Sequence, residues 1–205
     1  MSARAASQLP PWLWRLGVGL LALTLLGGAL LVLALNLGLH SPRPTRPPDR
    51  EAVDPASLEA APDATRVELL APAEADFTLE IDARPRAVPE GGYNGYGLIY
   101  RAQDAAHYYA FAVGSDGYYA VLRVVDGLER PLVDWQQFPH IRRGQQPNQL
   151  RVACAGAICR FYINDEYAAT VEDGMWLEGK VGLWARSYGS DPIAVAFERA
   201  RMWRR

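Results

Sequence analysis

Five arginine, tyrosine and aspartate residues lie close together in the sequence and have the chemistry of a binding surface: Arg101, Tyr108, Tyr119, Arg123 and Asp134. A guanidinium group donates hydrogen bonds in a fixed fork that suits hydroxyl and carboxylate oxygens. A tyrosine ring offers a flat surface on which a sugar ring could lie. Neighbouring arginines repel unless an acidic group compensates, and Asp134 could do so. We predict a ligand-binding site here and assign no catalytic residue, cofactor or metal.

The strands that would carry these residues follow one another between Tyr96 and Trp135. Residues 97–101 and 108–113 are rich in aromatic and β-branched residues and are too short for helices, which favours strands. Gly and Asp residues at 114–117 and 126–127 then reverse the chain twice. The stretch therefore predicts an antiparallel meander.

The lengths of the turns decide which side chains share a face, because side chains alternate along a strand. We assume a two-residue turn at 104–105 and a four-residue turn at 114–117. This register puts Arg101, Tyr108 and Arg123 in one row on the face away from the core. Even-length turns carry Asp134 to the same face and send Trp135 inward. The predicted site is this non-core face, although a merely solvated outer face would carry the same residues.

Further strands are predicted on both sides of the meander. Residues 77–84 alternate apolar and polar side chains, so Phe77, Leu79, Ile81 and Ala83 face the core. Later strands are expected at 149–154, 158–164, 167–171, 180–184 and 193–202, between turns rich in Gly, Asp and Asn. Many short strands at regular spacing predict an all-β fold over residues 63–205, an antiparallel sandwich or jelly roll.

The two cysteines, Cys154 and Cys159, flank a predicted two-residue turn at Gly156-Ala157. This turn pairs the cysteines directly across two strands, and it also pairs Val152 with Phe161 on the same apolar face. In a non-hydrogen-bonded pair the Cα atoms lie about 4.5 Å apart, within disulfide reach. We predict a disulfide and hence an oxidising compartment; reduced core cysteines would be expected in the cytosol.

An uncharged segment at residues 16–39 is dominated by Leu, Ala, Gly and Val. Its length suffices to cross a hydrocarbon core of about 30 Å as a helix. Trp12 and Trp14 precede it where an interfacial aromatic belt would lie. A cleaved signal peptide is the alternative, but its apolar region is usually only about 7 to 15 residues long. We predict one N-terminal transmembrane helix.

The positive-inside rule does not decide the orientation of this helix, because arginines lie on both of its sides. The orientation is therefore inferred from the segment and the domain that follow the helix. Residues 40–62 are rich in proline and describe an extended linker that holds a domain clear of a membrane. Together with the predicted disulfide, this linker predicts that residues 1–15 are cytoplasmic and that the domain at 63–205 is extracytoplasmic. The expected location is the cell membrane, with a single pass.

The charge of the chain bears on its partners. The formal net charge of −2 gives no reason to expect nucleic acid. The expected partners are therefore the membrane and a glycan or a cell-surface protein.

Several strand and turn motifs resemble one superfamily. They are GYGLIYR at 95–101, YYAFAV at 108–113, SDGY at 115–118, Asp134-Trp135, NQLRV at 148–152, FYIN at 161–164 and GKVGL at 179–183. They are similar to the concanavalin A-like lectin/glucanase superfamily, and within it to the laminin G-like jelly rolls of bacterial surface proteins, which grade into the 3-keto-disaccharide hydrolase family. The resemblance implies a two-sheet jelly roll over residues 75–203. The motifs are turn and core residues, so they specify a fold better than a function.

The resemblance also raises the question of catalysis. Glucanases of this superfamily place carboxylates on one strand in a Glu-x-Asp-x-x-Glu pattern, since retaining hydrolysis needs two carboxyl groups about 5 Å apart. This chain has Glu80-Ile81-Asp82, but Pro85 stands where the second glutamate belongs. A polar outer face explains Glu80 and Asp82 without chemistry. The sequence thus favours a membrane-anchored binding module; a saccharide-acting hydrolase and a purely structural ectodomain are the alternatives.

Overall fold

The computed structural model describes residues 11–36, 44–73, 75–88 and 93–204, which belong to two compact units, 1–40 and 41–205. The first unit contains α1 (Pro11–Asn36). Its segment Arg15–Leu33 has a mean hydropathy of 2.4, so α1 is long and apolar enough to cross a membrane, a test that a signal sequence also passes. The helix begins earlier than predicted, at a proline, because proline fits the first turn of a helix.

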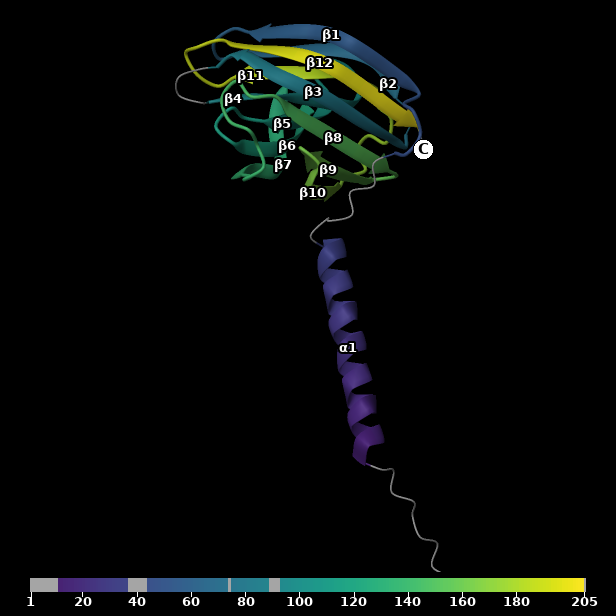
Figure 1. Ribbon diagram of the computed structural model, residues 1–205. Helices are drawn as coiled ribbons and strands as arrows, with labels where there is room; N and C mark the ends of the chain where they lie inside the picture. Colours follow the sequence, from purple (N-terminus) through teal and green to yellow (C-terminus); the bar gives the residue numbers. More distant parts are fainter. Residues whose placement is uncertain (1–10, 37–43, 74, 89–92, 205) are drawn as a thin grey trace, which may run out of the picture. The chain divides into compact units, whose positions relative to one another are not determined.

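The second unit is built from twelve strands in two antiparallel sheets (Figure 1). The first sheet has the order β1 (Arg50–Ala60), β12 (Ile193–Arg204), β3 (Phe77–Ala87), β8 (Asn148–Ala155), β9 (Ile158–Ile163) and β10 (Glu166–Glu172). The second has the order β2 (Thr65–Ala73), β11 (Gly179–Ser187), β4 (Asn94–Ala102), β5 (Tyr108–Val113), β6 (Tyr118–Val125) and β7 (Leu128–Gln137). This is the predicted all-β jelly-roll sandwich.

The main core lies between the two sheets. Strand β3 buries Phe77, Leu79, Ile81 and Ala83, as its alternation predicted. The predicted pairing of β8 with β9 is also confirmed, with Cys154 opposite Cys159. These two residues form the predicted disulfide.

Strand β1 departs from the prediction, because residues 50–60 were expected to belong to an extended linker. They pair with β12 along the edge of the first sheet, and Leu58 and Ala60 are buried. Proline is tolerated on an edge strand or at a bulge. Pro55 lies where the register shifts between Val53 and Ala56, so the proline content that suggested a linker is compatible with a strand.

The outermost strands of both sheets share one irregularity. Each of them, β1 and β10 in the first sheet and β2 and β7 in the second, contains at least one register shift against its neighbour. Three of them also contain a proline: Pro55 in β1, Pro72 in β2 and Pro131 in β7. Regular pairing is therefore interrupted along every outer strand.

Candidate functional site

The turn between β5 and β6 is one residue shorter than predicted, which changes the faces of β6. The backbone N–H of Gly114 donates to the carbonyl of Tyr118 at 2.7 Å, so only residues 115–117 form the turn. Gly117 adopts a positive φ of 97°, which favours glycine. Because an odd-length turn replaces an even one, every side chain of β6 points to the opposite face from that predicted.

This change turns two predicted site residues to the inner side of the sheet. Arg123 lies opposite Tyr109, and its Nη1 donates to Asp173 Oδ2 at 2.6 Å on the inner side of the sheet. Tyr119 is 3% exposed, and its hydroxyl donates to the carbonyl of Ala168 at 2.9 Å. Neither side chain lies on the face predicted to bind a ligand.

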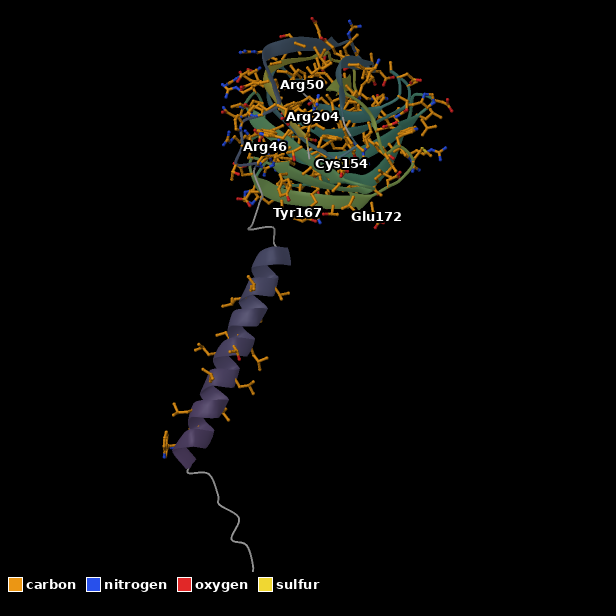
Figure 2. All side chains as sticks on the ribbon, turned by 90° about the vertical axis from the view of Figure 1, so that its right-hand side faces the viewer. Arg46, Arg50, Cys154, Tyr167, Glu172 and Arg204 are labelled. Carbon is orange, nitrogen blue, oxygen red and sulfur yellow. A yellow bond between two sulfur atoms is a disulfide. The ribbon has the colours of Figure 1, made fainter. Side chains whose placement is uncertain are left out.

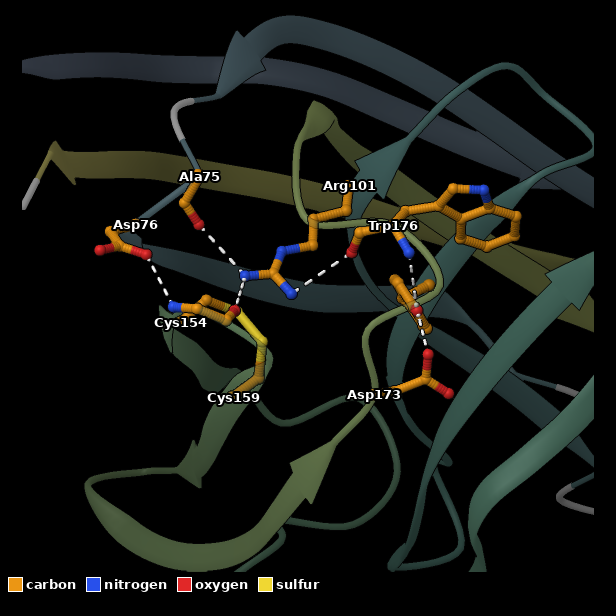
Figure 3. Close-up of a disulfide and its surroundings, with 9 residues drawn as sticks. Ala75, Asp76, Arg101, Cys154, Cys159, Asp173 and Trp176 are labelled. Atoms are coloured by element: carbon orange, nitrogen blue, oxygen red, sulfur yellow. Dashed lines mark hydrogen bonds between the residues drawn. A yellow bond between two sulfur atoms is a disulfide. The ribbon is translucent and has the colours of Figure 1, made fainter.

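Arg101 is also buried, for a different reason. Its φ is 52°, and the register of β11 with β4 shifts around it, as in a bulge that re-aims a side chain. Its guanidinium donates to the carbonyls of Ala75 (3.1 Å), Gly156 (2.5 Å) and Trp176 (3.4 Å), as Figure 3 shows. Burial lowers the pKa of Arg101 below its usual value. The side chain ties three loops together, so the predicted row of Arg101, Tyr108 and Arg123 does not form.

Tyr108 does lie on the predicted non-core face. The β7 residues Asp134 and Trp135 do not follow the predicted register. The Tyr108 hydroxyl accepts a hydrogen bond from Trp184 Nε1 at 3.3 Å. Asp134 is exposed on β7. Trp135 was expected to point inward but packs on the non-core face, because β7 is bulged against the inverted β6.

The non-core face of the second sheet is apolar and aromatic rather than charged. Small side chains on its central strands form a floor, and large rings from β5, β7, β11 and the residue after β11 lie over it. We call this surface the aromatic face; it consists of Tyr108, Trp135, Trp184 and Tyr188 over Gly97, Ala110, Ala112 and Ala120. Gly95 makes room for it, since a Cβ there would lie 2.7 Å from the Trp184 ring.

Two rings of the aromatic face remain partly exposed. Trp135 and Tyr188 meet edge to face, with their centroids 6.0 Å apart. Trp184 beneath them is fully buried. Trp135 and Tyr188 thus present part of their ring surfaces to solvent above a buried base.

An ion pair borders these rings. The Arg186 guanidinium lies 4.7 Å above the Tyr188 ring and donates to Glu129 Oε1 at 3.0 Å. The Tyr188 hydroxyl donates to Glu129 Oε2 at 2.9 Å. Burial raises the pKa of Tyr108 to about 12 and that of Tyr188 further, so both phenols stay protonated at neutral pH. The buried Nε of Arg186 has no hydrogen-bond partner among the described residues.

Sequence reasoning selected this face but only one of its residues. Tyr108 is the predicted site residue that lies on it, while Trp135 was expected in the core because the register predicted for β7 was wrong. The residues that were missed lie in β11 or directly after it: Trp184, Arg186 and Tyr188. Strand β11 pairs with β4, although the two strands are far apart in the sequence. The signal that could have found them was the aromatic content of residues 180–188, for which no register was predicted.

The carboxylates of β3 do not form a catalytic pair accessible to a substrate. Glu80 Oε1 and Asp82 Oδ2 contact the same nitrogen, Arg201 Nη2, at 2.8 and 2.9 Å. Glu80 is only 3% exposed and also lies 3.8 Å from Arg151 Nη1. The two carboxylates are close together, as hydrolysis requires, but an arginine stands between them.

Comparison with known proteins supports the fold. No family model matches the sequence, and no curated protein matches it either. A carbohydrate binding module, CBM66 from Bacillus subtilis, is similar in structure with a TM-score of 0.55 and 17% identity, over 70% of this chain and 83% of that one. A functionally unknown protein from Saccharomyces cerevisiae has a TM-score of 0.56 and 12% identity, over 77% and 93%.

A third similar structure belongs to a larger protein. The GH43 protein BlXynB from Bacillus licheniformis has a TM-score of 0.54 and 14% identity, over 73% of this chain and 32% of that one. The chain therefore spans about a third of that protein. At these identities the likenesses establish a shared sandwich fold.

Proposed function

We propose that this protein is a membrane-anchored, extracytoplasmic glycan-binding module that holds a saccharide on the aromatic face. The observation that carries the proposal is the pair of partly exposed rings, Trp135 and Tyr188, on a floor of Gly and Ala. The C–H groups of a sugar ring pack well on aromatic faces, and Arg186 and Glu129 lie beside the rings to bond its hydroxyls. A similar structure is itself named as a carbohydrate binding module.

The geometry favours binding over hydrolysis and over a purely structural role. The Glu80–Asp82 pair, which is the candidate for hydrolysis, is occupied by Arg201. Two adjacent, partly exposed rings beside an ion pair support a binding role over a purely structural one. The apolar helix α1 supports anchoring, and the disulfide supports an oxidising compartment.

Binding should depend on Trp135. We expect residues 41–205, screened against an array of oligosaccharides and then titrated with a hit, to lose at least about tenfold in affinity on Trp135→Ala, which corresponds to about 1.4 kcal/mol. The reason is the loss of ring stacking together with the apolar area of the indole. Isothermal titration calorimetry measures the change.

The matched control is Tyr167→Ala, which removes an aromatic ring from β10 in the other sheet and should leave affinity unchanged. Circular dichroism should show both variants folded. Tyr188→Ala serves as a second probe should Trp135→Ala fail to fold. Full affinity in a folded Trp135→Ala, Tyr188→Ala double variant would exclude this face as the binding site.

Protease accessibility should reveal the orientation of the domain. We expect protease added to intact cells to digest the chain after residue 44, because the disulfide requires an oxidising compartment and therefore the outer side. A cytoplasmic protein in the same cells should stay intact. Survival of the domain until the membrane is permeabilised would contradict the proposed orientation.

A further inference from the structure

One end of the domain combines the entry of the chain with exposed aliphatic side chains. Strand β12 ends here, β1 begins here, and the loops 75–76, 103–107, 126–127, 156–157 and 173–178 all lie at this end. We call it the entry end; Figure 2 looks onto it, with Arg46, Arg204 and Cys154 labelled. Trp203 Nε1 donates to the carbonyl of Arg46 at 2.9 Å, which fastens the incoming chain.

The exposed aliphatic residues of the domain gather at the entry end. Leu128 is 65% exposed, Met175 52%, Leu177 48% and Ile158 36%. Among the described residues of the domain, Leu70 is the one other large aliphatic residue with comparable exposure. Grouped apolar side chains on a soluble surface mark an interaction site.

The loop 173–178 is built to project two of these side chains. Asp173 accepts hydrogen bonds from Tyr109 and Arg123, at 2.5 and 2.6 Å. The Trp176 carbonyl accepts a hydrogen bond from Arg101. The indole ring of Trp176 packs edge to face against the Tyr109 ring, with the centroids 5.2 Å apart. These inward anchors alternate with Met175 and Leu177, so the loop holds both side chains outward in a fixed geometry, which reduces the entropy lost on binding.

We infer that the entry end rests on the membrane surface, with Met175 and Leu177 inserted among zwitterionic phospholipids. This inference rests on the proposed anchoring by α1. Residues 37–43 separate the helix from Pro44, and a segment of this length spans at most about 30 Å even when fully extended. A tether this short gives a high effective concentration, in the millimolar range, so weak insertion suffices.

The charges of this end select the kind of lipid. Glu172 and Glu178 are exposed beside the loop, together with Lys180 and Arg204. His107 contacts Asp104 at 2.9 Å and Asp126 at 3.0 Å, and the hydrogen bond to Asp104 raises the pKa of His107. Both signs of charge are thus interspersed, which suits a phosphocholine headgroup better than an anionic one.

Photo-cross-linking tests the inference. The full chain is placed in phosphatidylcholine vesicles that contain a photoactivatable phosphatidylcholine, which has a diazirine in the upper acyl chain. We expect lipid cross-links on peptides covering 173–178 and on α1, and none on peptides covering 188–192 at the opposite end. Met175→Asp with Leu177→Asp should lower the loop cross-links at least about tenfold, because charged side chains are costly in hydrocarbon. Tyr93→Asp, which changes a residue 70% exposed at the other end, is the matched control and should have no effect.

Two failures can be distinguished in the same sample. Cross-links on α1 without cross-links on 173–178 would overturn the docking and leave the anchor intact. A lack of cross-links on α1 would overturn the anchoring and the docking together. Cross-links from this loop to a second copy of the chain, instead of to lipid, would assign the patch to a dimer and overturn the membrane contact.

Discussion

Replacing Gly97 with alanine should lower the free energy of unfolding by about 3 kcal/mol or more, because overpacking against atoms that cannot move is strongly destabilising. Gly97 lies in β4 between Ala112 of β5 and Trp184 of β11. A Cβ there would overlap the carbonyl oxygen of Phe111 and approach its carbonyl carbon to 3.0 Å and the Ala112 Cα to 3.1 Å. All three are backbone atoms of a central strand, so relief requires that β4 and β5 separate.

Thermal or chemical denaturation of residues 41–205 measures this effect, and a loss of this size lowers the melting temperature by about 10 °C. Gly189→Ala is the matched control, since a Cβ there meets nothing within 4 Å. It should change stability by less than about 0.5 kcal/mol. A Gly97→Ala domain as stable as the wild type would show that β4 and β5 are not packed as described.

Replacing Arg101 with methionine should cost about 3 kcal/mol of stability, although the volume of the side chain is largely kept. The carbonyls of Ala75, Gly156 and Trp176 would lose their donor in these part-buried hydrogen bonds, and a polar group costs about 1–3 kcal/mol where water does not replace the lost donor. Part of this cost is offset because a buried charge is removed. Urea denaturation of the oxidised domain measures the difference.

The loss should be accompanied by a local change that a general loss of stability would not produce. Amide hydrogen exchange in residues 174–178 should quicken more than in residues 115–117, because Arg101 holds the first loop and not the second. Arg84→Met, which removes a half-exposed arginine paired with Glu198, should cost less than about 1 kcal/mol. Equal stability of Arg101→Met and wild type would mean that water satisfies the three carbonyls.

The fold was predictable because its signals are local. Alternation in β3 placed Phe77, Leu79 and Ile81 in the core, and the Gly156-Ala157 turn gave the pairing that joins Cys154 to Cys159. These predictions required only the period of a strand and the length of a two-residue turn. Apolar character alone likewise identified α1.

The candidate site was less predictable because it depends on the parity of turns and on bulges. One residue fewer in the turn at 115–117 moved Arg123 and Tyr119 inside, and the bulge at Arg101 turned that side chain towards the loops. Both features preserve the hydrophobic pattern of the meander, since its core and non-core faces are both apolar. Alternation of apolar and polar side chains normally fixes the register, but in this meander it could not reveal the one-residue error.

The interrupted outer strands determine how the domain behaves when many copies crowd on one surface. An uninterrupted outer strand offers a row of free N–H and C=O groups to a neighbouring molecule, which is the start of cross-β aggregation. Each outer strand here contains a register shift, and Pro55, Pro72 and Pro131 remove donors from three of them. Under the proposed anchoring, the chains would be confined to two dimensions and would meet often, and this protection would then allow a high surface density without sheet-to-sheet polymerisation.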